Sequence, residues 1–187
     1  MSIYAISDLH LSGEPAKKPM DIFGEHWTNH KEKVKENWLA TIKEEDTVII
    51  CGDISWAMQL REVEEDLLWI AQLPGKKILM RGNHDYWWTS LKKMQATFGE
   101  HFEFLQNNCI MAEGTAICGT RGWTCPDGNN LSEHDQKIYN REVERLKLSI
   151  QQMQKERRFN KYGNRVAHAR TDMIVLIEIT RTLKKAH

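Results

Sequence analysis

Acidic, histidine and asparagine side chains follow three short apolar runs in the first half of the chain. The motifs are Asp8-Leu9-His10 after residues 3–6, Gly52-Asp53 after residues 48–51, and Gly82-Asn83-His84-Asp85 after residues 78–80. Apolar runs of this kind are typical of buried strands, and open α/β sheets build their sites at the C-terminal ends of such strands. The side chains at these ends therefore predict a metal site, and their number favours a site for two ions.

The spacing within the motifs suits divalent metals. Asp8 and His10 are two residues apart, so in an extended segment both side chains point to the same side and reach one ion. Asp53 has two carboxylate oxygens and can bridge two ions, and Asn83 adds a neutral carbonyl oxygen. Two ions about 3.5–4 Å apart lower the pKa of a bridging water and hold the attacking and leaving oxygens of an in-line displacement. That chemistry suits phosphate esters.

Each motif also has a simpler interpretation. Alone, an Asp-x-His pair is usually a surface or capping pair, and a Gly-Asp pair is usually a turn. The motif at 82–85 is more specific, yet alone it is compatible with an ordinary loop. All three motifs in order, each at a predicted strand end, favour the metal site over these alternatives. The glycines that open the second and third motifs permit sharp turns in a crowded site.

The elements that position the motifs alternate between strand and helix. Apolar runs predict strands at residues 3–7, 47–51 and 77–81, and helical periodicity predicts helices at about 25–43, 61–72 and 88–98. This β-α-β-α-β order predicts an α/β fold with a largely parallel sheet and right-handed crossovers. Trp87 and Trp88 stand at the start of the third helix. We favour core packing for them over lining of a substrate pocket.

The pattern changes after residue 100. Short strands are expected at 102–113 and 115–119, with turns at Asn107-Asn108 and Gly114 and a glycine-containing loop at 119–123. In that loop Arg121 is either a phosphate contact or a solvated arginine. Ser132, with an aspartate three residues later, predicts a helix start, and apolar residues at 139, 143, 146, 150 and 153 predict an amphipathic helix. The apolar run 173–179 could form one more strand.

Length and composition favour a single domain in a cytoplasmic protein. The 187 residues carry 26 basic and 26 acidic side chains, so the net charge gives no argument for nucleic acid or an anionic membrane as a partner. The four cysteines lack C-x-x-C spacing and are expected to be reduced thiols. Neither a secretory signal pattern nor a membrane-spanning apolar stretch is visible. Oligomeric state cannot be inferred from the sequence.

The charge is unevenly distributed. Residues 155–187 carry nine Lys and Arg against three Asp and Glu. Binding of nucleic acid by this basic tail stays open as an alternative but is not indicated, because the tail lacks interleaved aromatic residues.

The three motifs resemble the first motifs of the calcineurin-like metallophosphoesterase superfamily. The matching residues are Asp8-x-His10, Gly52-Asp53 and Gly82-Asn83-His84-Asp85, and residues 119–123 resemble a segment of its small bacterial members. The resemblance covers about residues 1–150 and implies a β-sandwich core flanked by helices. It also implies hydrolysis of phosphomonoesters or phosphodiesters by a metal-bound hydroxide at a dinuclear centre of Mn, Fe or Zn. A nuclease is an alternative, because the superfamily includes nucleases.

The resemblance further implies a role for each motif residue. The implied metal ligands are Asp8 and His10 for the first ion, Asp53 for both ions, and Asn83 for the second. His84 would lie near the phosphate and protonate the leaving oxygen or stabilise the transition state. Asp85 would orient His84, as carboxylates often hold an imidazole.

The chain departs from the superfamily pattern in its second half. The superfamily has a histidine after a later strand and a Gly-His-x-His motif, and this chain has neither in recognisable form. His168 and His187 are weak substitutes. We therefore expect a metallophosphoesterase domain at 1–150 and a basic divergent tail at 151–187, which is a truncated, frame-shifted or diverged end. The main alternative to an active enzyme is an inactive or weakly metal-binding fragment that acts, if at all, as a binding module.

Overall fold

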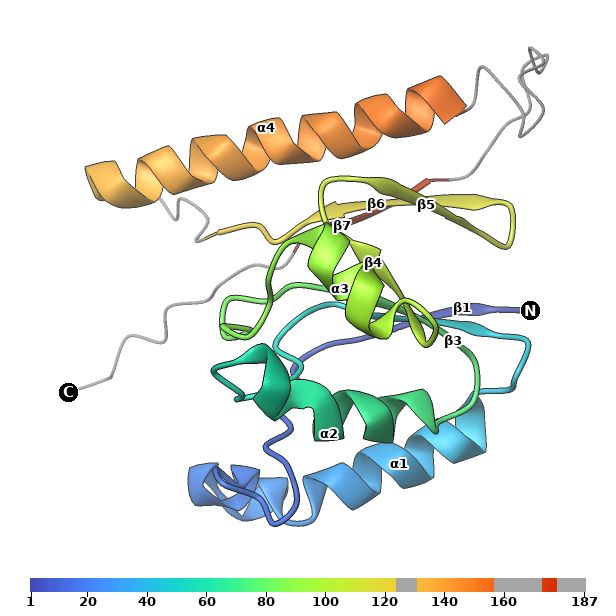
Figure 1. Ribbon diagram of the computed structural model, residues 1–187, viewed down its shortest axis with the longest axis vertical. Helices are drawn as coiled ribbons and strands as arrows, with labels where there is room; N and C mark the ends of the chain where they lie inside the picture. Colours follow the sequence, from blue (N-terminus) through green and yellow to red (C-terminus); the bar gives the residue numbers. More distant parts are fainter. Residues whose placement is uncertain (124–130, 157–172, 178–187) are drawn as a thin grey trace. The chain divides into compact units, whose positions relative to one another are not determined.

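The computed structural model describes residues 1–123, 131–156 and 173–177 and divides into two compact units (Figure 1). The first unit comprises residues 1–104 and the second residues 105–187. The first unit contains all six predicted site residues. Within the described part of the chain, no helix combines the length and the apolar character needed to cross a bilayer.

The first unit is built on a four-stranded sheet of order β1-β2-β3-β4. The strands are β1 Ile3–Ile6, β2 Thr47–Ile50, β3 Lys76–Met80 and β4 Phe102–Leu105. Strands β1, β2 and β3 are parallel, with Ile6 opposite Ile50 and Ile50 opposite Leu79. The C-terminal ends of the three strands therefore meet at one edge, where the sequence predicts the site.

The helices of this unit lie close to their predicted positions, with two shifted starts. They are η1 Met20–Phe23, η2 Glu25–Trp27, α1 His30–Thr41, α2 Leu60–Ala71 and α3 Leu91–Phe98. The helix predicted at 25–43 begins only at residue 30, because Asn29 takes a left-handed conformation with φ 55° and separates α1 from a short 3₁₀ turn. The helix predicted at 88–98 begins at residue 91, where the Ser90 side chain accepts the Lys93 N–H and caps it.

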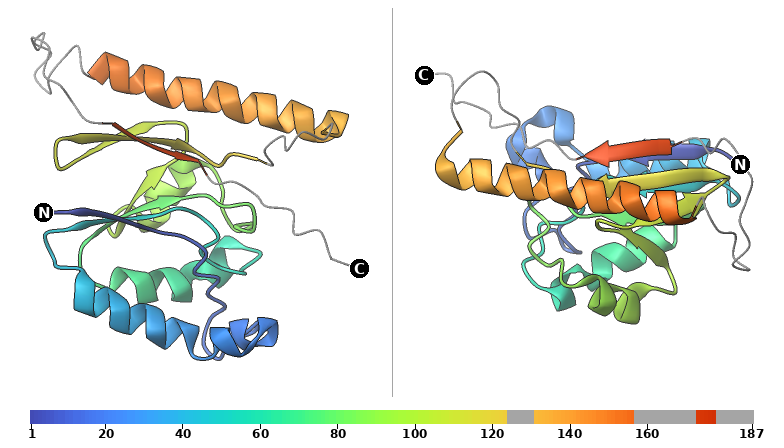
Figure 2. Two further views of the ribbon diagram at one scale, coloured as in Figure 1. Left: turned by 180° about the vertical axis from the view of Figure 1, so that it is seen from behind. Right: turned by 90° about the horizontal axis from the view of Figure 1, so that it is seen from above.

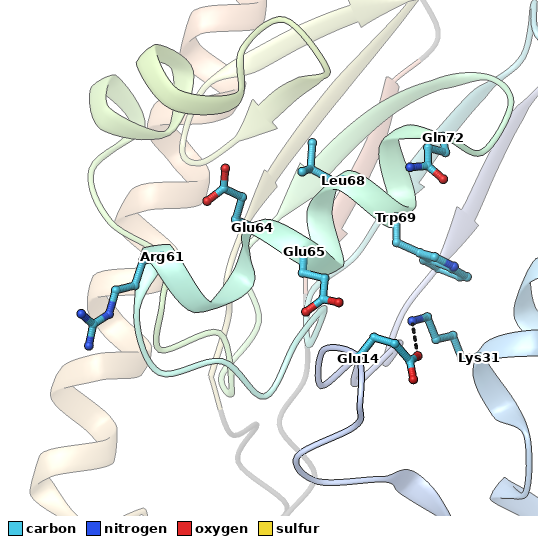
Figure 3. Close-up of a pocket in the computed structure, with 8 residues that line it drawn as sticks. All are labelled: Glu14, Lys31, Arg61, Glu64, Glu65, Leu68, Trp69 and Gln72. Atoms are coloured by element: carbon cyan, nitrogen blue, oxygen red, sulfur yellow. Dashed lines mark hydrogen bonds and ion pairs between the residues drawn. The ribbon is translucent and has the colours of Figure 1, made fainter.

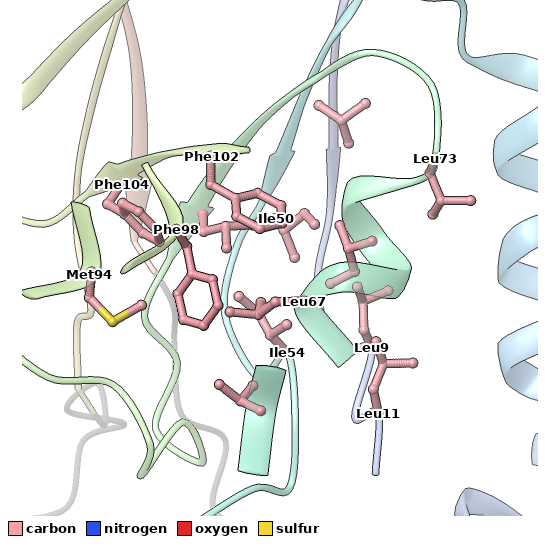
Figure 4. Packing of buried hydrophobic residues seen from close by; sticks show 14 of the residues in the cluster. Leu9, Leu11, Ile50, Ile54, Leu67, Leu73, Met94, Phe98, Phe102 and Phe104 are labelled. Carbon is pink, nitrogen blue, oxygen red and sulfur yellow. The ribbon is translucent and has the colours of Figure 1, made fainter. Parts of the chain in front are cut away.

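The core of the first unit packs α2 and α3 against the sheet (Figure 4). Val63, Leu67 and Ile70 form the apolar stripe of α2 and are fully buried. Each such side chain contributes roughly 1.5–3 kcal/mol relative to an exposed position. Trp87 and Trp88 are 1% and 4% exposed and belong to the same cluster, so the expectation of core packing is confirmed.

The second unit combines a three-stranded sheet with one long helix (Figure 2). Strands β5 Cys109–Ala112 and β6 Thr115–Thr120 form an antiparallel hairpin, and β7 Met173–Ile177 pairs with β6 in parallel. The turn predicted at Asn107-Asn108 separates β4 from β5, and Asn107 has φ 63° there. The expected additional strand at 173–179 is present as β7 over its first five residues.

Helix α4, Glu133–Glu156, covers β5 and β6. It begins as predicted, since the Ser132 hydroxyl accepts the Asp135 N–H at 3.1 Å. Ser149 is fully buried on α4. Its hydroxyl donates to the Asn108 carbonyl and accepts the Gly119 N–H at 3.0 Å, which ties the helix to the edges of the hairpin.

Candidate metal centre

Three predicted ligands converge at the ends of β1 and β2. One ligand atom from each of Asp8, His10 and Asp53 lies within 4.8 Å of the other two. His10 Nε2 is 3.6 Å from Asp8 Oδ1 and 3.8 Å from Asp53 Oδ2. The Asp8 side chain is 58% exposed, whereas those of His10 and Asp53 are 11% and 6% exposed. The group is therefore accessible to solvent through Asp8, whereas the other two side chains are largely buried.

These separations fit a shared divalent ion. Ligand bonds of about 2.0–2.2 Å place two ligands of one ion roughly 3–4.4 Å apart. The distances from His10 Nε2 to the two carboxylates lie in that range and are too long for hydrogen bonds. Carboxylate and imidazole ligands suit Mn, Fe and Zn. The neighbouring His10 imidazole lowers the pKa of Asp8, and the Ser7 hydroxyl adds to this effect against partial burial, so Asp8 is ready to bind as a carboxylate.

Backbone hydrogen bonds hold the first two motifs side by side. Asp8 N–H donates to the Gly52 carbonyl at 3.1 Å, and His10 N–H donates to the Asp53 carbonyl at 2.9 Å. Asp8, His10 and Asp53 all have positive φ, at 59°, 45° and 50°. The sequence interpretation placed Asp8 and His10 on an extended segment, and this is wrong. Left-handed turns aim their side chains toward Asp53 instead, at a cost of about 1–3 kcal/mol for each such residue.

The two glycines that precede the ligands meet at the centre of the site. A Cβ on Gly82 would lie 2.1 Å from Asp53 N and 2.2 Å from its Oδ1. A Cβ on Gly52, which has φ +98°, would lie 2.6 Å from the Gly82 Cα. No other residue fits in this contact, so the crowding expected from the sequence is confirmed.

A backbone N–H of the third motif is hydrogen-bonded to the side chain of Asp53. The His84 N–H donates to Asp53 Oδ1 at 2.8 Å, which leaves Asp53 Oδ2 facing His10. The preceding residue, Asn83, is half-buried in the same loop. The His84 ring lies 5.9 Å from the His10 ring and 5.0 Å from that of Trp56. The motif thus places His84 beside the converging ligands.

Asp85 is fully buried and accepts hydrogen bonds from three backbone N–H groups and one indole. Its Oδ2 accepts the Gly82 N–H at 2.7 Å, and its Oδ1 accepts the N–H of Ile54 at 2.9 Å. The same oxygen accepts the N–H of Ser55 and the indole N–H of Trp87. Burial raises the pKa of Asp85 to about 6, although the backbone hydrogen bonds oppose this shift. Asp85 therefore fixes the conformation of the loops that carry Asp53 and Asn83.

A second buried carboxylate was not found by sequence reasoning. Asp66 on α2 accepts the Ser55 hydroxyl at 2.6 Å and the Gly13 N–H at 2.8 Å. Burial raises the pKa of Asp66, and its two hydrogen bonds partly offset that effect. One signal was available, because Asp66 stands between Val63 and Leu67 on an otherwise apolar stripe. A carboxylate in that position needs buried partners.

Two further residues missed from the sequence hold the first motif. The Trp56 ring stacks on the His10 ring, with centroids 4.5 Å apart and an interplanar angle of 17°. His30 Nε2 lies 2.9 Å from the carbonyl oxygen of Leu9, between the two predicted ligands. Trp56 lies in a predicted loop and His30 in a predicted helix. Nothing in the local sequence around either residue indicates a functional role.

The other sequence candidates, Arg121, His168 and His187, belong to the second unit. The Arg121 guanidinium, in the second unit, lies 4.6 Å from the Trp123 ring centroid. His168 and His187 lie outside the described residues. A hollow of about 520 Å³ beside α2 is lined by other residues than the predicted ligands (Figure 3). Lys31 pairs there with Glu14 at 3.3 Å and lies 5.4 Å from the Trp69 ring centroid.

Comparisons with known proteins agree with this geometry. A family model described as calcineurin-like phosphoesterase matches residues 1–175. The Gene 66 protein of Mycobacterium phage L5 is 35% identical over 81 residues, which are 42% of this chain and 37% of that protein. The Gene 66 protein of Mycobacterium phage D29 is 32% identical over 84 residues, 45% of this chain and 40% of that protein. The aligned part thus spans well under half of these relatives.

One solved structure is also similar over most of the chain. It is a protein of unknown function from Aquifex aeolicus, with 22% sequence identity, coverage of 95% of this chain and 90% of that one, and a TM-score of 0.44. The family match covers nearly the whole sequence and includes all three motifs, and the mixed α/β structure with its parallel sheet is consistent with it. The chain belongs to the calcineurin-like phosphoesterase family.

Proposed function

We propose that the protein hydrolyses phosphomonoesters or phosphodiesters with two divalent metal ions held by Asp8, His10, Asp53 and Asn83. The observation that carries the proposal is the convergence of three ligand atoms within 4.8 Å at the ends of two parallel strands. The family match supports metal-dependent phosphoesterase chemistry in general. Mn, Fe and Zn are the ions that such mixed oxygen and nitrogen ligands favour.

Bound divalent ions supply positive charge for the phosphate and lower the pKa of water. The residues of the chain hold and orient the reactants. Asp53 faces His10 with one oxygen and accepts the His84 N–H with the other, so it fixes the first and third motifs relative to each other. Asp8, His10 and Asp53 would hold one ion, and Asp53 and Asn83 would hold the other.

Among the described residues, we assign His84 to act on the leaving oxygen. Its backbone is fixed to Asp53, and its ring is partly exposed beside His10 and Trp56. An imidazole in this position can donate a proton to the departing oxygen or stabilise negative charge on the phosphate. Asp85 acts as a positioning residue for the loop beneath it.

Metal binding and turnover test the proposal together. Mn²⁺ is titrated into the full chain by calorimetry, and hydrolysis of p-nitrophenyl phosphate and bis(p-nitrophenyl) phosphate is measured with Mn²⁺ added. We expect Mn²⁺ binding and turnover of at least one ester. Asp53→Asn should lower the Mn²⁺ affinity by more than the roughly 10- to 100-fold that loss of an outer partner costs.

The matched control is Asp21→Asn, an exposed aspartate of η1, which should leave both readouts unchanged. Mn²⁺ binding without turnover would replace the enzyme by a metal-binding module. Absence of Mn²⁺ binding, or equal behaviour of the Asp53 variant and the unmodified protein, would overturn the proposal. Cleavage of a single-stranded oligonucleotide would identify the nuclease branch of the phosphodiesterase function.

A further inference from the structure

A row of rings crosses the candidate metal centre within the first unit. The Phe23 ring lies 6.3 Å from the Trp56 ring at an interplanar angle of 24°, and the Trp56 ring stacks on His10 at 4.5 Å. On the other side, the His84 ring lies 5.0 Å from Trp56 and 6.3 Å from Tyr86. The row therefore runs without a break from Phe23, past a predicted metal ligand, to Tyr86.

Both ends of the row are exposed to solvent. Phe23 is 50% and Tyr86 55% exposed, whereas the three rings between them are partly buried. The exposed rings come from different segments, since Phe23 ends η1 and Tyr86 follows β3. The exposed face of a single amphipathic helix therefore does not explain both exposed rings. Exposed aromatic side chains gathered beside a polar site are a feature of ligand-binding surfaces.

A cation and a buried donor add polar groups to this row. Lys18 Nζ lies 3.2 Å from the Trp56 ring centroid and 5.4 Å from that of Phe23, which is a cation–π arrangement. The Trp56 Nε1 is buried and has no hydrogen-bond partner among the described residues. Buried donors are nearly always satisfied by protein, water or ligand. The Phe23 end of the row thus offers a positive charge next to stacked rings.

We propose that the exposed rings of Phe23 and Tyr86, together with Lys18, form a stacking surface that selects phosphoesters carrying a planar aromatic group, such as nucleotides. The inference rests on the proposed function, because it names the substrate class of the same site. Aromatic faces bind bases by stacking whatever the base, and a nearby cation attracts the phosphates of the same ligand. Exposed rings at both ends of the row let a base stack on either side of the phosphate.

A role in holding His10 in place does not explain why Phe23 and Tyr86 are present in the row. Trp56 stacks on His10 and would be needed for that role. Phe23, however, contacts Trp56, and Tyr86 contacts His84 at the far end. Their exposed rings are therefore free to stack on a ligand while the inner rings hold the predicted metal ligand in place.

The test compares two phosphomonoesters that differ in the aromatic group. Adenosine 5′-monophosphate and glycerol 3-phosphate are titrated by calorimetry into the full chain with Mn²⁺ present. We expect adenosine monophosphate to bind roughly 5- to 150-fold more tightly, the range given by stacking of one base. The double variant Phe23→Ala/Tyr86→Ala should remove most of this difference while leaving the affinity for glycerol phosphate unchanged, because a base that loses one exposed ring can still stack on the other.

Controls separate stacking from general effects at the surface. Ile22→Ala and Met58→Ala alter neighbouring apolar side chains that are 62% and 60% exposed and lie outside the row, so both should preserve the preference. A second readout does not depend on turnover. Adenosine monophosphate should quench tryptophan fluorescence in the unmodified protein and do so less in Trp56→Phe, whose folding is checked by circular dichroism.

The outcomes distinguish this inference from the function on which it rests. Equal affinity for the two phosphomonoesters, or an unchanged preference in the double alanine variant, would overturn the stacking surface even if Mn²⁺-dependent hydrolysis is observed. Preferential binding of adenosine monophosphate without any hydrolysis would support the stacking surface and reject the enzyme.

Discussion

The carboxylate of Asp85 accepts the backbone N–H of Ile54 at 2.9 Å and so joins the loop after β3 to the loop after β2. The same carboxylate accepts the N–H of Gly82 from its own loop. One buried side chain thereby fixes the relative position of two segments that carry predicted metal ligands. Its ionisation is consequently linked to the stability of the first unit.

Asp85 should make the metal-free protein less stable as the pH rises. Burial raises the pKa of Asp85 from 3.8 to about 6, so between these values the folded state binds more protons than the unfolded state. The free energy of unfolding therefore falls as the pH increases through this window, by about 3 kcal/mol. Urea unfolding of Asp85→Asn between pH 4 and 7 should show a shallower decline than the unmodified protein. An identical pH slope in the two proteins would contradict the assignment.

Asp46 should have the opposite effect. Its carboxylate accepts the N–H of Ser2 at 2.7 Å and that of Lys43 at 3.0 Å, and these hydrogen bonds, that from Lys43 first, lower its pKa below 3.8. The resulting stabilisation is present above the unfolded-state pKa and is lost as the pH falls through the folded-state pKa. Asp46→Asn should be less stable than the unmodified protein at pH 7 and should converge with it once the pH falls below the folded-state pKa of Asp46. Glu45→Gln, at an exposed neighbour, should show no such convergence.

The contact between Gly82 and Asp53 should be intolerant of a methyl group. Gly82→Ala introduces a Cβ 2.1 Å from Asp53 N, and overpacking of this kind costs about 1–3 kcal/mol or more. The displaced Asp53 should also bind Mn²⁺ more weakly. Gly114→Ala is the control, because Gly114 has φ +76° but nothing within 4 Å of its Cβ position. It should lose some stability without any change in Mn²⁺ affinity, as measured by urea unfolding and calorimetry.

Ser149 should contribute to the stability of the second unit independently of the site. Ser149→Ala removes a donor to the Asn108 carbonyl and leaves the buried Gly119 N–H without its acceptor. An unsatisfied buried group costs about 1–3 kcal/mol. Chemical denaturation should detect this loss, while Mn²⁺ affinity should stay constant. A variant as stable as the unmodified protein would show that another group, such as water, replaces the hydroxyl.

The sequence predicts the order of elements and the location of the site because both depend on local patterns. Apolar runs specify β1 to β3, and the motif residues stand directly at their ends. The conformation of the site depends instead on contacts between distant segments. Asp66 and Gly13 are 53 positions apart, and Asp85 and Ile54 are 31 apart. Neither the periodicity of apolar residues nor a turn motif predicts a hydrogen bond between residues so far apart in the sequence. The partners of Asp85 and the role of Asp66 were therefore found only in the structure.

The missed helix starts have a similar explanation. The apolar spacing of Val34, Trp38 and Ile42 identifies a helix but does not say where it begins. Its start depends on the left-handed conformation of Asn29. The extended conformation expected for Asp8 and His10 was also overridden by tertiary structure, because their N–H groups are paired with Gly52 and Asp53.

The left-handed turns at Asp8, His10 and Asp53 have a kinetic consequence. Backbone hydrogen bonds maintain these turns, so the ligand atoms converge before any ion arrives. Binding then requires no ordering of the loops, and the barrier to capture is the release of water from the ion. Association rates should accordingly follow the water-exchange rates of the metals, fast for Mn²⁺ and slow for Ni²⁺, rather than a single rate set by the protein.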